Sequence, residues 1–331
     1  MKTRIIESKS HNPWFNLAVE EFLKDDLEDD EVCLYLWQNA HTIVMGKHQN
    51  PWSEVNVELF EADRGTLARR TTGGGTVYHD LGNMNFTFAM DDKFMDLERQ
   101  LKVIVQALKK LGIDAEFSGR NDILADGRKF SGNAFSRGKG RYIHHGTIMF
   151  DVNMDALGKY LNVSEKKLES KAIKSVKSRV INLKELNPDL TVPLLYQGLA
   201  EAFEEIYAPA SKRYEISEES APEKVKELTA YYGSWDWLYG KSPNFDYTIE
   251  ERFDWGGLTI NFVLKDAKIE ESKIYSDAMS TLFIDKLIPC FTGVAFEKSA
   301  LKDALQKLSD ENEEFNTMIQ DIISWFDRIQ L

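Results

Sequence analysis

The sequence has little of what several large classes of protein require. It contains two cysteines, Cys33 and Cys290, which are too few for a disulfide framework or a structural zinc cluster. No apolar run approaches the ~20 residues that a membrane-spanning helix needs, and the first residues lack the apolar stretch and cleavage site of a signal peptide. We therefore expect a soluble cytoplasmic protein.

The sequence also lacks an overall positive charge. Its formal net charge is −13 and its pI about 5.1, which excludes the broad basic face of a nucleic-acid-binding protein. Two segments depart from this balance: 120–141 and 165–179 each carry six basic residues against two acidic ones, a net charge of +4. Such segments favour an anionic ligand, although a solvated charged surface would give the same pattern.

Apolar residues, in contrast, are plentiful enough for a packed core. The chain has 331 residues, 43% of them hydrophobic, which is long for one domain and sufficient for two. A Gly-, Ser- and Pro-rich stretch at 240–244 separates a long pattern of helices and strands from a shorter one. We expect an α/β domain over residues 1–245 and a small α+β domain over 246–331.

Hydrophobic periodicity and turn residues predict the main elements of both domains. The Asp126-Gly127 pair is typical of a two-residue hairpin turn, since both positions favour positive φ. We expect helices over 12–27, 97–111, 194–207 and 222–232; strands over 32–37, 42–46, 67–70, 77–79, 83–89, 123–125, 128–135 and 142–152; and, beyond the linker, two or three strands within 252–275 and two or three helices within 280–331.

The first candidate site is a glycine-rich turn. Gly73, Gly74 and Gly75 are consecutive, so a ligand can approach the main chain closely and successive N–H groups can cradle an anion. The preceding Arg69 and Arg70 carry forked guanidinium groups that suit carboxylates and phosphates. Alone, such a run is most often an ordinary tight turn. The pattern is neither a P-loop nor a dinucleotide-binding GxGxxG motif.

The second candidate site is the predicted hairpin. Simple alternation on its returning strand puts Lys129, Ser131 and Asn133 on one face, opposite Phe130. A lysine beside glycine and small polar residues can bind an oxyanion or a phosphate, although a surface lysine on an edge strand is the commoner arrangement.

Two pairs of neighbouring polar residues extend this region. Asn121 and Asp122 can hold a magnesium ion that bridges phosphates, or can cap a turn. His144 and His145 are adjacent on a predicted strand, so they point to opposite faces and do not share a metal. We expect one histidine to line a pocket and the other to be structural.

Together these segments resemble the lipoate–protein ligase A family. Their order and spacing cover nearly the whole chain, whereas any single segment would be weak evidence. The matching segments are PWFNLAVEE at 13–21, LWQNAHTIVMGKHQNPW at 36–52, LARRTTGGGTVYHDLGNMNFTF at 67–88, SGRNDI at 118–123, RKFSGNAF at 128–135, HHGT at 144–147, SVKSRVINL at 175–183 and ERFDWGGLTI at 251–260.

The resemblance implies a fold and an activity. The fold is a biotin/lipoate ligase-like catalytic domain related to class II aminoacyl-tRNA synthetases, plus a small C-terminal accessory domain. The activity is ATP-dependent conversion of lipoate to lipoyl-AMP and pyrophosphate, with Mg²⁺, followed by transfer to a lysine of lipoyl domains. The implied partners are the acyltransferase subunits of 2-oxoacid dehydrogenases and the glycine cleavage carrier protein. The implied protein is a monomer that binds neither nucleic acid nor membranes.

The resemblance also implies roles for individual residues. Lys129 corresponds to the catalytic residue, which binds both the lipoate carboxylate and the nucleotide α-phosphate, and Asp122 is a candidate magnesium ligand. The basic segment that ends at Arg179 corresponds to a loop that closes over the adenylate. The implied ATP contacts are Arg70, Gly75, Thr76, Val77, Tyr78, Asn83, Asp122, Lys129 and Arg179; the implied lipoate contacts are Arg70, Gly73, Gly74, Gly75, His79, Lys129 and His145.

This chemistry fits the residue types. A carboxylate that attacks the α-phosphate brings two anions together, so the site needs fixed cations and N–H donors and no nucleophilic side chain. The lipoyl tail is apolar, and we expect a slot lined by side chains such as Phe86 and Phe88.

Three alternatives stay open at this point. An ATP-independent octanoyl or lipoyl transferase of the same superfamily would use a cysteine, but neither Cys33 nor Cys290 stands beside the motifs. A biotin–protein ligase would leave HHGT and ERFDWGGLTI without a clear place, and a non-catalytic module that binds lipoyl carriers would not need Lys129. The preference for lipoate over octanoate rests on the resemblance alone.

Overall fold

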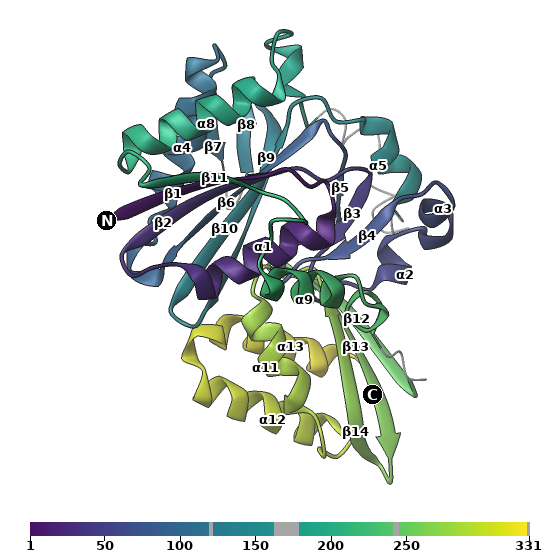
Figure 1. Ribbon diagram of the computed structural model, residues 1–331. Helices are drawn as coiled ribbons and strands as arrows, with labels where there is room; N and C mark the ends of the chain where they lie inside the picture. The colour runs from purple at the N-terminus through teal and green to yellow at the C-terminus, as the bar shows by residue number, and fades with distance from the viewer. Residues whose placement is uncertain (119–121, 162–178, 241–244, 330–331) are drawn as a thin grey trace. The chain divides into compact units, whose positions relative to one another are not determined.

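The structure is a computed structural model that describes residues 1–118, 122–161, 179–240 and 245–329. The predicted linker residues 241–244 and most of the second positive segment lie outside these ranges. The chain divides into two compact units (Figure 1): the first comprises Met1–Met45, Pro51–Arg70 and Thr76–Leu238, and the second comprises Gly46–Asn50, Thr71–Gly75 and Tyr239–Leu331. Over the described part of the chain, we find no helix with the length and apolar character needed to cross a membrane.

A large mixed sheet forms the centre of the first unit. Its eight strands lie in the order β11-β1-β2-β6-β10-β9-β8-β7. The β1 strand pairs in parallel with both β11 and β2, and the other pairings are antiparallel. The strands are β1 (Lys2–Ser8), β2 (Glu31–Trp37), β6 (Asn83–Asp91), β7 (Ala115–Ser118), β8 (Asp122–Ala125), β9 (Arg128–Gly138), β10 (Arg141–Met149) and β11 (Lys212–Ile216).

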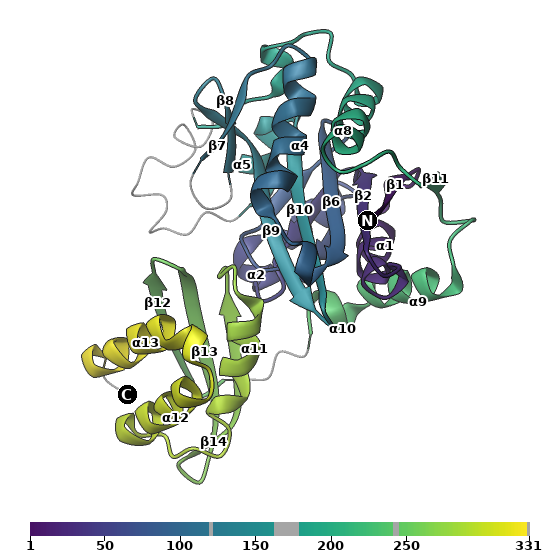
Figure 2. The ribbon, with the colours of Figure 1, turned by 90° about the vertical axis from the view of Figure 1, so that its left-hand side faces the viewer.

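Helices cover both faces of this sheet, as Figure 1 shows. The helices α1 (Pro13–Asp26) and α9 (Glu223–Tyr232) pack on one face, which we call the α1 face; α4 (Leu97–Lys110) and α8 (Val192–Ile206) pack on the other, the α4 face (Figure 2). The β2 strand is buried along its whole length, as its continuous apolar run predicts. Its alternate residues enter the two cores: Val32, Leu34 and Leu36 on the α4 face, and Cys33, Tyr35 and Trp37 on the α1 face.

Local sequence explains where several of these elements begin and turn. Asn12 caps α1, because its side chain accepts hydrogen bonds from the N–H groups of Trp14 and Phe15, and Pro13 occupies the first turn, where a missing N–H costs nothing. The β8–β9 hairpin turns at Asp126 and Gly127, whose φ values of 50° and 67° are those expected for this pair.

A second, smaller sheet lies within the first unit. It has the order β4-β3-β5, with β3 parallel to β4 and antiparallel to β5. It carries Arg70 just after β4 and His79 at the end of β5. The strands are β3 (Thr42–Met45), β4 (Thr66–Arg69) and β5 (Val77–His79), and the shorter helices of this unit are α2 (Pro51–Glu54), α3 (Val57–Ala62), α5 (Met154–Tyr160) and α10 (Trp235–Leu238).

The second unit contains an antiparallel sheet and three helices with their own apolar core. Its elements are β12 (Tyr247–Phe253), β13 (Gly256–Lys265), β14 (Lys268–Ser276), α11 (Thr281–Cys290), α12 (Lys298–Glu311) and α13 (Asn316–Arg328). The three strands and three helices agree with the α+β pattern expected for the end of the chain. The boundary at residue 245 stays a prediction.

Candidate active site

Lys129 and Asp122 form an ion pair on the hairpin of the first unit. The Lys129 Nζ lies 2.7 Å from Asp122 Oδ1, and each side chain retains 36% of its exposure. Gly132 leaves room for this lysine, because a Cβ atom there would lie 3.3 Å from both Lys129 Cε and Nζ. The ammonium group is therefore held in place while remaining accessible.

The returning strand β9 contains a β-bulge that corrects one prediction. The pairing register shifts between Ile123 and Leu124: Ser131 lies opposite Ile123, and Lys129 opposite Leu124. The extra residue reverses the alternation, so Ser131 faces the α4 side with Ile123 while Lys129 faces the α1 side. The prediction that Lys129, Ser131 and Asn133 share a face is wrong for this reason.

Polar groups continue from this hairpin across the α1 face of the sheet. Thr147 Oγ1 accepts a hydrogen bond from the Gly132 N–H at 3.2 Å, and Thr147 pairs with Asn85 on the next strand. Asn83 Nδ2 donates to Asn85 Oδ1 at 3.1 Å, and both asparagines are buried. Asn83, an expected nucleotide contact, therefore lies on the same face as Lys129.

A buried carboxylate–histidine pair lies on this face too. Both Glu20 oxygens lie 2.9 Å from His145 Nδ1, and Thr87 Oγ1 donates to Glu20 Oε2 at 2.7 Å. Burial alone would raise the pKa of Glu20, but the His145 charge and the hydrogen bonds from His145 and Thr87 outweigh it and lower that pKa. Glu20 is therefore ionised, and His145 Nδ1 carries the proton between them.

The neighbouring His144 points the opposite way, as strand alternation predicts. Its Nδ1 lies 2.6 Å from Gln100 Oε1 of α4, and its Nε2 lies 2.9 Å from Asn133 Oδ1. Burial lowers the pKa of His144 to about 3. Its contacts are those of a structural residue.

Arg70 and His79 are both buried beside this pair. Arg70 Nη1 donates to Val44 O at 3.2 Å, and burial lowers its pKa to about 10. Burial, with the charges of Arg70 and His145, lowers the pKa of His79 to about 3, so this ring is neutral near pH 7. Asn39 Nδ2 lies 3.3 Å from His79 Nδ1; with Nδ1 as the acceptor, Nε2 carries the proton. Within the described residues this buried Nε2 has no hydrogen-bond partner.

The depressed pKa of His79 predicts a pH dependence of stability. Its folded pKa of about 3 lies below its ordinary 6.5, so between these values the unfolded chain binds a proton that the folded chain does not. The contribution of the neutral His79 to the free energy of unfolding is therefore fully present above pH 6.5 and is lost as the pH falls toward 3. Below pH 6.5, we expect the free energy of unfolding of His79→Gln to fall less steeply with pH than that of the wild type, by about 1.4 kcal/mol per pH unit. Urea unfolding at pH 7, 6 and 5 measures it. Equal pH slopes in both proteins would contradict a neutral buried His79.

The first positive segment is largely neutralised in the structure. Arg128 pairs with Glu185 at 3.0 Å, Arg137 with Asp92 at 3.0 Å and Lys139 with Asp25 at 2.9 Å; Arg141 pairs with Asp91. Arg128, Arg137 and Lys139 therefore belong to a solvated charged surface, the alternative to an anion-binding island, whereas Arg141 is mostly covered.

The two phenylalanines expected in the lipoyl slot lie elsewhere. Phe86 and Phe88 are fully buried, with ring centroids 5.7 Å apart, in the core on the α4 face. Neither can line a slot on the side of Lys129, so this prediction is wrong. On the α1 face, the apolar residues of β6 and of its neighbours β2 and β10 include Trp37, Ala89 and Ile143.

The glycine-rich turn belongs to the second unit. Gly74 has a φ of +91° and its N–H donates to Ala278 O at 3.2 Å. A Cβ atom on Gly73 would lie 2.2 Å from the same oxygen, so only glycine fits there, whereas one on Gly75 would meet nothing within 4 Å. The Gly74 N–H, expected to face an anion, is used here within the protein.

The remaining predicted residues have defined places in the first unit. The Lys129 N–H donates to Arg179 O at 2.8 Å, which puts the end of the second positive segment beside Lys129. Residues 162–178 lie outside the described residues. Tyr78 Oη lies 3.0 Å from His41 Nδ1, and burial raises the pKa of Tyr78 to about 12. Thr76 and Val77 precede it and are partly exposed.

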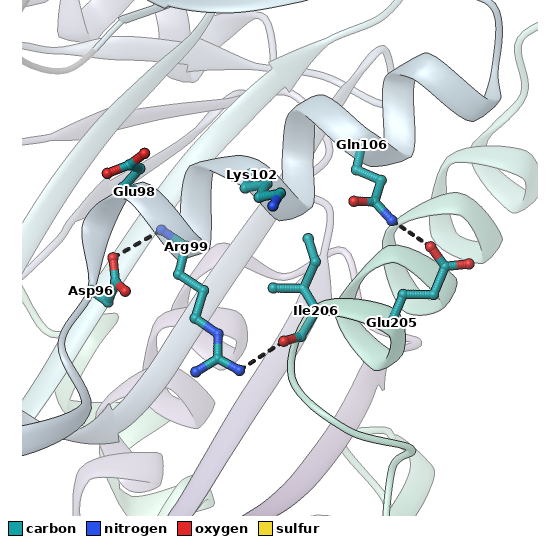
Figure 3. Close-up of a pocket in the computed structure, with 7 residues that line it drawn as sticks. All are labelled: Asp96, Glu98, Arg99, Lys102, Gln106, Glu205 and Ile206. Carbon is teal, nitrogen blue, oxygen red and sulfur yellow. Dashed lines mark hydrogen bonds between the residues drawn. The ribbon is translucent and has the colours of Figure 1, made fainter.

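A groove on the α4 face is less suited to a ligand. Some of its lining groups already bond one another, as Figure 3 shows: Arg99 Nη2 donates to the main-chain oxygen of Ile206 at 2.7 Å, and Gln106 donates to Glu205. The groove lies on the opposite face from Lys129. Its lining residues are Asp96, Glu98, Arg99, Lys102, Gln106, Glu205 and Ile206.

Comparison with known proteins identifies the family. Residues 12–204 match the lipoyl protein ligase A/B catalytic domain, and residues 242–326 match the bacterial lipoate protein ligase C-terminus. The chain is 42% identical to lipoate-protein ligase A of Psychrobacter cryohalolentis over 98% of both proteins. It is 37% identical to that of Bdellovibrio bacteriovorus, over 98% of this chain and 97% of the other. This chain belongs to the lipoate–protein ligase A family.

Solved ligase structures share its fold. Plasmodium falciparum LipL1, in complex with lipoate, is 31% identical over 98% of both chains, with a TM-score of 0.85. A bipartite lipoate protein ligase of Thermoplasma acidophilum, described with its E2 lipoyl domain, is 25% identical over 75% of this chain and all of the other, with a TM-score of 0.64. A lipoate-protein ligase A bound with ATP is 25% identical over 72% of this chain and 99% of the other, with a TM-score of 0.61. The expected family, fold class and enzyme class are confirmed.

Sequence reasoning missed two residues beside the candidate site. Glu20 and Thr87 were not among the expected site residues, yet Glu20 pairs with His145 and Thr87 donates a hydrogen bond to Glu20. A polar residue at a buried helical position is the signal that could have revealed Glu20, since a buried carboxylate requires partners.

The metal prediction rests on one carboxylate. In the described ranges there is no group of three or more His, Cys, Asp or Glu side chains that could hold a metal ion. Asp122 alone still fits the usual arrangement for Mg²⁺, in which one or two carboxylates act together with substrate phosphates.

Proposed function

We propose that this ligase activates lipoate with ATP, forming lipoyl-AMP and pyrophosphate, and transfers the lipoyl group to a lysine of a lipoyl domain. The Lys129–Asp122 pair carries this proposal, because it presents a cation on the α1 face, which also bears His145, with Arg70 and His79 of the smaller sheet beside that histidine. The relatives support it: one is described with lipoate, one with ATP and one with an E2 lipoyl domain.

Lys129 is the catalytic residue in this proposal. Its ammonium group contacts the lipoate carboxylate and the α-phosphate, and so offsets the repulsion between two anions as the new P–O bond forms and pyrophosphate leaves. Because Asp122 holds it in advance, little reorganisation is needed at the moment of reaction. The proposed nucleotide contacts are Arg70, Gly75, Thr76, Val77, Tyr78, Asn83, Asp122, Lys129 and Arg179.

His79 supplies a hydrogen-bond donor. A buried N–H without a partner costs roughly 1–3 kcal/mol, and a ligand oxygen would recover that cost at Nε2. The ring stays neutral near pH 7, since its pKa is about 3. It can therefore donate to an anion without adding a charge that must be buried.

The lipoyl tail occupies the α1 face in this proposal. Trp37, Ala89 and Ile143 lie on this face but are buried in its core, so in this proposal the tail lies next to His145 on the same face. The proposed lipoate contacts are Arg70, Gly73, Gly74, Gly75, His79, Lys129 and His145.

Mg²⁺ fits this chemistry as a partner of Asp122. When bound, the ion would neutralise part of the phosphate charge. Asp122 already forms an ion pair with Lys129, so this carboxylate would serve both cations.

We further propose that the adenylating and transferase activity resides in residues 1–245, with 246–331 as an accessory domain. The proposed acceptors are lipoyl domains of 2-oxoacid dehydrogenase acyltransferase subunits and the glycine cleavage carrier protein. The proposed enzyme acts as a monomer.

The ATP-independent transferase is disfavoured by the state of the cysteines. Cys33 is fully buried in β2, and burial raises its pKa to about 12. Burial likewise raises the pKa of Cys290 to about 12. A nucleophilic cysteine needs a lowered pKa and access to substrate, and neither residue has these properties.

Lipoylation of a purified lipoyl domain tests the overall reaction. We expect one lysine to gain a lipoyl group, seen as a mass increase, only when enzyme, lipoate and ATP are all present. Transfer from an octanoylated carrier without ATP would instead identify the transferase.

A further inference from the structure

The two arginines before the glycine-rich turn face different partners. Arg69 is buried, with 7% of its surface exposed. Its Nε donates to Trp237 O at 3.0 Å and to Leu238 O at 3.2 Å, and its Nη2 donates to Leu238 O at 2.5 Å. Its guanidinium group thus donates to main-chain carbonyls at the end of α10. These carbonyls have no hydrogen-bond partner within the helix itself.

The contact is reciprocal. Trp237 Nε1 donates back to Arg69 O at 2.9 Å. The Trp237 ring is held in turn by Tyr231 and Tyr232, with ring centroids 5.2 and 5.4 Å away. Arg69 is therefore tied to α10 twice: its side chain bonds main-chain carbonyls there, and its own carbonyl accepts from the Trp237 indole.

This clamp joins ends of the first unit that are far apart in sequence. The chain passes between the two units at five points, and Met45, Arg70 and Leu238 are the last residues of the first unit at three of them. The Arg70 N–H donates to Met45 O at 3.0 Å, and Arg69 bonds Leu238 O. All three ends are thereby fastened to one another inside the first unit.

We propose that Arg69 is a positioning residue of this ligase: through the clamp with Trp237 it fixes the main chain that carries Arg70 and continues into the glycine-rich turn. Neighbouring residues at the end of a strand point in opposite directions, so anchoring Arg69 to α10 directs Arg70 away from α10. Arg70 Nη1 in turn reaches Val44 O. The inference rests on the proposed function, in which Arg70 and this turn bind ATP.

Two substitutions weaken the clamp without leaving a large cavity in the core. Arg69→Lys removes the fork, since one ammonium group cannot bond both carbonyls as the guanidinium does. Trp237→Phe keeps an aromatic ring but removes the N–H that bonds Arg69 O. Trp235→Phe is the matched control, because Trp235 lies on the same short helix and is 57% exposed.

We expect each clamp variant to raise the KM for ATP by roughly tenfold, because small displacements of positioning groups are costly, while Trp235→Phe leaves it unchanged. The double variant should be no worse than the poorer single one, since both changes break the same clamp. Fully additive effects, or a lowered melting temperature with an unchanged KM for ATP, would overturn the proposal.

Hydrogen exchange of the free protein separates this inference from the function itself. The amides of residues 66–76 should lose protection in Trp237→Phe and keep it in Trp235→Phe, whether or not the enzyme turns over. Unchanged protection would overturn the clamp. Lost protection in an enzyme without lipoate-dependent activity would uphold the clamp and contradict the proposed function.

Discussion

Replacing Lys129 with methionine should reduce lipoyl-AMP formation by roughly a thousandfold, the effect of removing a preorganised charge from a transition state that joins two anions. Methionine has a similar length, so the neighbouring Gly132 still accommodates the side chain. The fold should persist, because both partners of the Lys129–Asp122 pair are partly exposed. Single-turnover formation of labelled lipoyl-AMP measures the effect.

Lys184→Met is the control for this variant. Lys184 also pairs with a carboxylate at 2.7 Å, that of Asp151, and is exposed to a similar extent. Losing a surface ion pair of this kind costs about 1 kcal/mol or less, so activity should be unchanged. If Lys129→Met kept the activity of Lys184→Met, Lys129 would have no place in the site.

Gly73→Ala should destabilise the second unit. The new Cβ atom would lie 2.2 Å from Ala278 O and 2.6 Å from Met279 O, both on the main chain, so the backbone must move. Overpacking of this kind costs about 1–3 kcal/mol. Chemical unfolding followed by tryptophan fluorescence measures the loss, because Trp325 lies in the core of the second unit.

Gly75→Ala separates packing from binding in the same turn. A Cβ atom there meets nothing within 4 Å, so stability should equal that of the wild type. If Gly75 lies against the nucleotide, as proposed, the KM for ATP should rise. Equal stability of the Gly73 and Gly75 variants would contradict the close approach of Gly73 to Ala278.

Elements with strong local signals could be predicted from sequence. The continuous apolar run of β2 gave a fully buried strand. The helix expected over 12–27 is α1, and the Asp126-Gly127 pair marked the hairpin turn. In each case the deciding interactions lie within a few residues of one another.

Elements that depend on distant partners were missed. The β1 strand pairs with β2 and also with β11, about two hundred residues away in sequence, as in the register of Arg4 with Lys212. The β11 strand is a mostly exposed edge strand with charged residues, so it lacks an apolar alternation. The short helices α2, α3 and α5 have too few turns to show a clear period.

The same distinction between local and distant contacts applies to the candidate site. Lys129 and Asp122 could be proposed because one hairpin brings them together. The Glu20–His145 pair spans 125 positions and depends on how α1 packs on the sheet. The bulge in β9 adds one residue, so side chains on its two sides point to faces other than those that simple alternation predicts. Counting residues along one strand does not reveal such a bulge.

ATP–pyrophosphate exchange, with lipoate, octanoate and biotin supplied in turn, tests the central claim most directly. Exchange reports the reversible formation of an acyl-adenylate and needs no carrier protein. We predict exchange that depends on lipoate and is absent with biotin; the result with octanoate defines how selective the acyl slot is. Absence of exchange with every acid, in a folded enzyme supplied with Mg²⁺, would contradict the proposed ATP-dependent ligase.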